Sequence, residues 1–121
     1  MPRILLVDSD PDIAPAVKRY LVWFGLDVDL AVDCQDAMPK LKSVKYDLIV
    51  LSVFSTFREG CAHLKEIRAL PGLKNQRVAL TGPEEPEFKD YTLLKKSDAH
   101  FINKYGPPSG WYEKIDMILR I

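Results

Sequence analysis

Cysteine and histidine are scarce in this sequence, and neither forms a metal-binding pattern. The two cysteines, Cys34 and Cys61, make neither a CxxC pair nor another spacing typical of metal ligands. A reduced, cytoplasmic setting is therefore the simpler interpretation, with both thiols as small, partly buried side chains. The two histidines, His63 and His100, are isolated in the sequence, so surface or packing roles are expected for them.

The sequence also lacks an excess of either charge. Lys+Arg and Asp+Glu number 17 each, so bulk charge gives no indication of binding to nucleic acid or to an anionic membrane. There is no apolar run long enough to cross a bilayer, and no basic segment followed by an apolar one near the start. Repeats and low-complexity linkers are absent as well. Residues 1–121 are therefore expected to form a single domain with one core.

The sequence does contain a strict alternation of short apolar runs and amphipathic segments. Short continuous apolar runs indicate buried strands, and apolar residues at helical spacing indicate helices packed on them. Strands are expected at 3–7, 27–33, 47–54, 77–81 and 99–104, and helices at 11–24, 34–44, 58–70, within 84–97 and from 110 to 121. Five strand–helix pairs in this order predict an α/β fold, with a parallel sheet covered by helices on both faces.

Several residues indicate how the expected helices begin. Asp10 is a good N-cap with Pro11 at the first helical position, and Ser109 is expected to cap the last helix. Pro15 and Pro39 each fall about one turn inside an expected helix, where proline removes a backbone hydrogen bond. Three explanations stay open for these prolines: helices that start later than expected, distorted first turns, or simple tolerance near a helix end.

The candidate functional residues follow the expected strands. In parallel sheets of this kind, function gathers beyond the carboxyl ends of the strands, at the point where the strand order switches. The side chains that the pattern places at those ends are Asp8, Ser9, Asp10, Ser52, Thr81 and Lys104.

Four stretches resemble those of response-regulator receiver domains, in the family's order and at near-family spacing. They are RILLVDSDPDI at 3–13, YDLIVLSVFSTFREG at 46–60, LTG at 80–82 and HFINK at 100–104. The resemblance covers essentially the whole chain. It implies a flavodoxin-like receiver fold with strand order 2-1-3-4-5, and a role in a two-component system or phosphorelay rather than as an enzyme.

The sequence departs from the family's pattern at the residues that carry its chemistry. The family has two adjacent carboxylates after the first strand, whereas here Asp8 is followed by Ser9. Ser52 stands at the position of the family's phosphoacceptor aspartate. Thr56 and Tyr105 stand where the family usually has prolines. The resemblance therefore identifies a degenerate variant of the receiver.

These departures remove what phosphoryl transfer to a receiver needs. The acceptor must be anionic at neutral pH, and Mg²⁺ must neutralise the phosphoryl oxygens. A serine hydroxyl is not ionised and needs a neighbouring base. Because Asp8 is the one remaining carboxylate of three, Mg²⁺ binding is expected to be weak or absent, and no cofactor is expected. Asp8 and Lys104 are expected to contact each other instead, directly or through water.

Two further residues match the family's switch. Thr81 occupies the position of the family's threonine, and Phe101 lies where the family often has a switch aromatic. The pair could sense whether the pocket is occupied. The simpler interpretation is that the Thr81 hydroxyl makes a local hydrogen bond at a strand end.

The resemblance also indicates an interaction surface, formed in the family by its fourth helix, fifth strand and fifth helix. Trp111, Ile115 and Ile118 are more simply the core side of the last helix. The candidate contacts are Lys89, Asp90, Lys95, Lys96, Tyr105 and Tyr112. Tyrosines are enriched among residues that dominate such interfaces. A protein partner, or a second copy of the chain, is therefore expected at this surface, and neither nucleic acid nor a membrane.

The expected function is that of a pseudo-receiver, which takes part in signal transduction as a phosphorylation-independent protein–protein interaction module. Two alternatives stay open. One is a receiver still phosphorylated at an unusual acceptor such as Ser52. The other is a flavodoxin-like binder of a nucleotide or flavin, which the acidic turn DSDPD at 8–12 disfavours because it would repel a phosphate.

Overall fold

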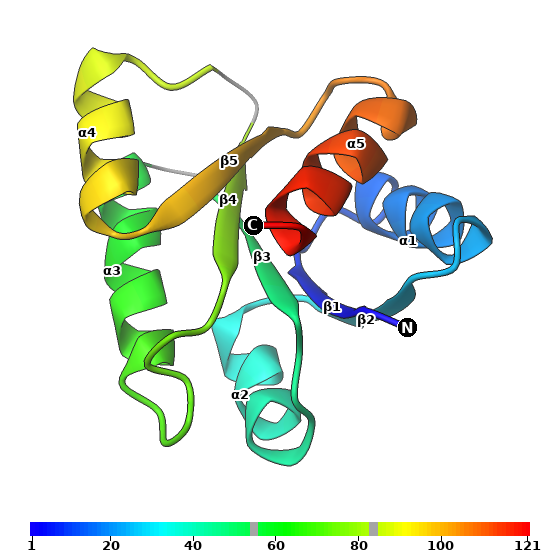
Figure 1. Ribbon diagram of the computed structural model, residues 1–121, viewed down its shortest axis with the longest axis horizontal. Coiled ribbons are helices and arrows are strands. Elements are labelled where there is room, and N and C mark those ends of the chain that lie inside the picture. Colours follow the sequence, from blue (N-terminus) through cyan, green and yellow to red (C-terminus); the bar gives the residue numbers. More distant parts are fainter. Residues whose placement is uncertain (54–55, 83–84) are drawn as a thin grey trace.

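A single parallel sheet of five strands organises the chain, with strand order β2-β1-β3-β4-β5 (Figure 1). The computed structural model describes residues 1–53, 56–82 and 85–121. The strands are β1 (Arg3–Val7), β2 (Asp27–Ala31), β3 (Leu48–Ser52), β4 (Val78–Gly82) and β5 (Ala99–Asn103). All neighbouring pairs run parallel. The predicted α/β fold class and strand order are confirmed.

Helices cover both faces of this sheet. They are α1 (Ile13–Trp23), α2 (Cys34–Ser43), α3 (Phe57–Arg68), α4 (Phe88–Lys96) and α5 (Pro108–Leu119). Figure 1 shows α1 and α5 together on one face and α2, α3 and α4 on the other. No helix within the described residues has both the length and the apolar character needed to span a membrane.

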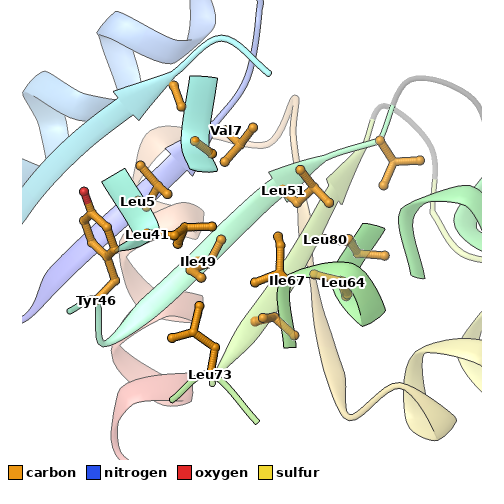
Figure 2. Close-up of a cluster of buried hydrophobic side chains, with 14 of the residues drawn as sticks. Leu5, Val7, Leu41, Tyr46, Ile49, Leu51, Leu64, Ile67, Leu73 and Leu80 are labelled. Atoms are coloured by element: carbon orange, nitrogen blue, oxygen red, sulfur yellow. The ribbon is translucent and has the colours of Figure 1, made fainter. Parts of the chain in front are cut away.

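The core consists of two hydrophobic clusters, one on each face of the sheet. Successive side chains of a strand point to opposite faces, so Leu5 and Val7 join the cluster under α2, α3 and α4, while Ile4 and Leu6 join the cluster under α1 and α5. Figure 2 shows the first cluster, in which Ile49 of β3 lies among side chains from the covering helices. Strands buried on both faces explain the continuous apolar runs.

Some predicted boundaries are too long. β2 ends at Ala31 instead of residue 33, because Asp33 caps α2 by accepting a hydrogen bond from the Asp36 amide at 2.7 Å. β3 ends at Ser52. The predicted strand residue Phe54 lies outside the described residues, as does Glu84, the first residue of the range expected to contain the fourth helix.

Two predicted helix starts are wrong. α1 begins at Ile13, so Pro11 lies in the preceding turn and not at the first helical position. Asp10 still supports this end of the helix, because its Oδ1 accepts hydrogen bonds from the amides of Asp12 (2.9 Å) and Ile13 (3.0 Å). α5 begins at Pro108 and not after Ser109. Proline suits a first helical turn because the missing N–H would have no partner there.

The two interior prolines have different settings. Pro15 is the third residue of α1, within the first turn, where its missing N–H removes no intrahelical hydrogen bond. Pro39 lies in the interior of α2 and does remove one. Ser43 donates its hydroxyl to the Pro39 carbonyl at 2.9 Å in the turn that follows.

Arg68, at the end of α3, forms hydrogen bonds with the segment before β4 and with the segment between α4 and β5, at the amino-terminal edge of the sheet. Its Nε and Nη2 donate to the carbonyl of Gln76 at 3.3 and 3.1 Å, and Nη2 also donates to the carbonyl of Asp98 at 2.7 Å. Its Nη1 bonds the carbonyl of Ser97, the C-cap of α4. One guanidinium therefore satisfies carbonyls that the end of α4 leaves without helical partners.

We expect Arg68→Ala to lower the free energy of unfolding by about 1–3 kcal/mol, because several carbonyls lose a charged donor. Urea unfolding at neutral pH measures this. The matched control is Arg19→Ala, since Arg19 is exposed on α1. Equal losses in the two variants would contradict the role given to Arg68.

Candidate functional site

Four buried polar side chains gather at the carboxyl edge of the sheet. Asp8 follows β1, Ser52 ends β3, Thr81 lies in β4 and Lys104 follows β5. Their exposed fractions are 4%, 9%, 0% and 3%, in that order. These four are the buried polar or charged residues of the described chain, and each was a candidate from the sequence.

Asp8 and Lys104 form a buried ion pair. The Lys104 Nζ lies 3.1 Å from Asp8 Oδ2 and 3.2 Å from Asp8 Oδ1, as the sequence led us to expect. The same ammonium donates to Ser52 Oγ at 3.1 Å. Asp8 Oδ1 also accepts from the Asp10 amide at 2.8 Å. Burial makes an unpaired charge very costly, so each of these two charges requires the other.

The backbone of Lys104 is held from two sides. Its amide donates to the Gly82 carbonyl at 3.1 Å. Its carbonyl accepts from the Trp111 indole Nε1 at 3.3 Å. Trp111 is buried in the core side of α5, as predicted, but the sequence analysis missed its link to Lys104. A signal was present, because a buried indole N–H usually finds an acceptor.

Thr81 differs from its expected role. Its hydroxyl is fully buried and has no hydrogen-bond partner among the described residues, so the predicted local hydrogen bond is wrong there. Phe101 is half-buried, and its ring packs on Phe57 with centroids 5.6 Å apart. Thr81 lies beside Ser52 in the register of β3 and β4.

The site's residues do not fit a family-type Mg²⁺ centre. Within the described part of the chain, Asp8 is the one buried carboxylate at this site, and it is already paired with Lys104. The amides of Ile13 and Asp12 hold the pKa of Asp10 below its usual value by hydrogen bonding to its carboxylate. Across the described residues, no three His, Cys, Asp or Glu side chains form a group able to hold a metal ion.

An open cleft of about 590 Å³ lies beside this site. It is lined by side chains from β1, the start of α2, β3 and α3, among them Ser9, Cys34, Gln35, Ser52 and His63. Sequence reasoning treated His63 and Cys34 as isolated residues and missed this cleft. The two serines could be placed from the sequence because they follow strands. Cys34, Gln35 and His63 lie on helices, and their position beside the cleft depends on how these helices pack on the sheet.

The candidate interaction residues divide into two groups. Lys89, Lys95, Lys96 and Tyr105 are exposed on or near α4 and β5, whereas Asp90 Oδ2 accepts from the Glu87 amide at 2.9 Å and so caps α4. Lys95 lines an open groove of about 810 Å³ between α4, β5 and α5, whereas Lys89 and Asp90 line a separate cleft between α3 and α4. His100 lines the groove beside α5, and burial together with nearby Lys114 lowers the pKa of its imidazole.

Tyr112 belongs to a different surface from the one predicted. Its ring stacks on Phe24 with centroids 4.6 Å apart, and Phe24 also contacts Tyr20 of α1 at 4.9 Å. Tyr112 therefore packs between α5 and α1, away from α4. The error arose because the resemblance assigns the fifth helix to the interaction surface without determining which neighbour each of its half-buried side chains faces.

We expect Lys104→Met to destabilise the fold by about 3–5 kcal/mol at neutral pH, because Asp8 would stay buried without its counter-ion. Chemical denaturation measures the loss. Exposed Lys95 offers the matched control Lys95→Met, which should change stability little. The double variant Asp8→Leu/Lys104→Met should recover most of the loss. If the single variant unfolds like wild type, the pair is not a structural requirement.

Comparisons with known proteins place this geometry in context. No family model matches the sequence. The transcriptional regulatory protein DltR of Streptococcus agalactiae is 32% identical over 83 residues, which cover 69% of this chain and 37% of the relative. TrcR of Mycobacterium tuberculosis is 36% identical over 66 residues, which cover 54% of this chain and 26% of the relative. The matched segment thus spans well under half the length of these curated relatives.

Solved structures agree along nearly the whole chain. A two-component response regulator from Clostridium difficile is 27% identical with a TM-score of 0.83, covering 99% of this chain and 97% of that one. A response regulator from Thermotoga maritima is 24% identical with a TM-score of 0.87, covering 100% and 99%. The chemotaxis protein CheY4 of Vibrio cholerae is 21% identical with a TM-score of 0.86, and the match covers 98% of this chain and 98% of that one. The fold and these similarities together support a response-regulator receiver domain of two-component signalling.

Proposed function

We propose that this domain is a pseudo-receiver: it takes part in signalling by binding other proteins, without phosphorylation of an aspartate. The observation that carries the proposal is the buried ion pair between Asp8 and Lys104, with Ser52 bound to the same ammonium. A receiver's reaction needs anionic oxygens around Mg²⁺ and an anionic acceptor. Here Asp8, the one buried carboxylate among the described residues, is neutralised from within the protein.

The environment of Ser52 argues against an activated serine. Its Oγ accepts a hydrogen bond from Lys104, and Asp8 accepts from the same ammonium. A nucleophilic serine needs a base that receives its proton. A lysine that donates to both Ser52 and a carboxylate is acting as a donor and not as that base. Ser52 is therefore a poor phosphoryl acceptor in this arrangement.

The exposed residues of α4 and the segment after β5 support a contact surface for a protein partner or a second copy of the chain. Lys89, Lys95, Lys96 and Tyr105 keep this role in the proposal, and 63% of the surface of Tyr105 is exposed. Exposed tyrosines and a polar rim fit such interfaces. Asp90 and Tyr112 leave the set, because the first caps α4 and the second packs on Phe24.

We expect the wild-type domain to gain no phosphoryl group when incubated with acetyl phosphate and Mg²⁺, because neither the acceptor nor the metal site carries enough negative charge. Intact-protein mass spectrometry measures the gain. A wild-type gain that maps to Ser52 would establish the serine-acceptor alternative and end the pseudo-receiver proposal.

The positive control is Ser9→Asp/Ser52→Asp, which returns carboxylates to both positions where the family has them. This variant should gain one phosphoryl group only when Mg²⁺ is present, and should lose it at alkaline pH as an acyl phosphate does. The single variant Ser9→Asp should stay unmodified, since it still lacks an acceptor. These variants separate a missing acceptor from an inaccessible pocket.

A further inference from the structure

β5 is an edge strand with backbone groups that no other strand pairs. It ends the strand order of the sheet, so it pairs with β4 on one side only. The Lys104 amide donates to the Gly82 carbonyl and therefore points toward β4. Because successive residues of a parallel strand direct their backbone groups to opposite sides, those of Ala99, Phe101 and Asn103 point away from β4. The structure records no hydrogen bond from these outward groups to the backbone of any described residue.

The groove of about 810 Å³ runs along this outer side of β5. All five residues of β5 line it, between α4, with Tyr91 and Leu94, and α5, with Gly110 and Lys114. Figure 1 shows α4 and α5 on either side of β5. A Cβ at Gly110 would meet no heavy atom within 4 Å, so the α5 wall leaves open space there. An extended segment as long as β5 itself, about 17 Å, therefore matches the length of strand that the groove exposes.

The two edges of the sheet differ in how they are protected. Charged side chains in an edge strand discourage pairing with a further strand. β2, at the opposite edge, contains Asp27 and Asp29, whereas β5 (AHFIN) contains no Asp, Glu, Lys or Arg. Burial and nearby Lys114 lower the pKa of His100, so this imidazole is mostly uncharged at neutral pH. β5 is therefore the edge that is open to strand addition.

The charged residues that line the groove are separated along its length. Glu85 lies at one end, where its carboxylate accepts a hydrogen bond at 3.2 Å from the side chain of the last residue of β5. Asp98 directly precedes β5 at the other end, next to Lys95 in the last turn of α4. Lys114 lies near His100, between these ends, and has no ion pair within the described residues. The lining is close to neutral overall, but Lys114 marks one position along β5 at which an acidic side chain is complementary.

We propose that β5 pairs with an extended segment of a partner protein, which lies in this groove as a sixth strand of the sheet. The backbone of that segment bonds the outward groups of Phe101 and Asn103. Its side chains alternate between the α4 wall, where apolar residues meet Leu94, and the α5 wall, where an acidic residue faces Lys114. A helical partner cannot fill this role, because its backbone groups are already paired within the helix. The inference rests on the proposed function, since it names the kind of partner for the surface at α4 and β5.

The test follows hydrogen–deuterium exchange of backbone amides by NMR. The probe is the end-capped peptide Val-Thr-Val-Glu-Val-Thr-Val at millimolar concentration. Without peptide, the Phe101 amide should exchange faster than the Ile102 amide, which points to β4. The peptide should slow exchange at Phe101 and Asn103 at least about fivefold, because strand pairing occupies these amides. An unchanged Phe101 amide would overturn the proposal. Protection of Phe101 that rises with protein concentration in the absence of peptide would assign the edge to a second copy of the chain and overturn it as well.

Two N-methylated forms of the peptide distinguish strand pairing from binding through side chains alone. One form carries N-methyl groups on the odd-numbered residues and the other on the even-numbered residues. Only alternate amides of an added strand face β5, so one form should bind at least about tenfold more weakly than the unmodified peptide, while the other keeps its affinity. Equal binding of the two forms, or an equal loss in both, would overturn the proposal.

Matched leucine variants locate the binding. Gly110→Leu places a side chain on the α5 wall of the groove and should weaken peptide binding at least about fivefold, whereas Ser109→Leu, at the exposed neighbouring residue outside the lining, should leave it unchanged. Leucine is a better helix former than glycine, so the weaker binding is not expected to reflect unfolding. Equal effects of the two variants would overturn the proposal. Acetyl phosphate plays no part here, so a peptide that fails to bind leaves the phosphorylation experiment to decide the loss of phosphorylation separately.

Discussion

The ion pair between Asp8 and Lys104 is the constraint on which the rest of the site depends. It joins the end of β1 to the end of β5, across 96 residues of sequence, and both side chains are almost fully buried. A pair of this kind need not stabilise the fold compared with apolar residues, but it makes each partner indispensable once the other is present. Substitutions nearby must therefore leave the charges of Asp8 and Lys104 balanced.

This balance explains why two serines fit where a receiver has carboxylates. A lysine beside a single carboxylate is neutral overall, whereas extra carboxylates in the same pocket would need a bound cation to offset them. The serines at positions 9 and 52 add hydroxyl groups without adding charge. The fold does not depend on the positions at which this sequence departs from the receiver pattern. The strands and the core clusters include none of these positions except Ser52, the last residue of β3.

The strands could be predicted from the sequence because their signal is local, whereas the strand order followed from the resemblance to receiver domains. Runs such as 3–7 and 48–52 are apolar on both faces and end at polar residues, so both the strands and their functional ends could be located. Contacts that involve the helices could not be predicted in the same way. The stacking of Tyr112 on Phe24, the position of His63 beside the cleft and the bond from Trp111 to Lys104 depend on how helices pack over the sheet.

The same contacts indicate how rigid the site is. Lys104 is held through its side chain by Asp8 and Ser52 and through its carbonyl by Trp111. Lys104 therefore couples the carboxyl edge of the sheet to α5. A rearrangement of this edge would have to break at least one of these contacts. The Thr81 hydroxyl is the exception, since it is buried without a hydrogen-bond partner among the described residues, and such a polar group costs about 1–3 kcal/mol. That cost disappears once a new acceptor or donor reaches Thr81, so the hydroxyl biases the site toward any arrangement that supplies one.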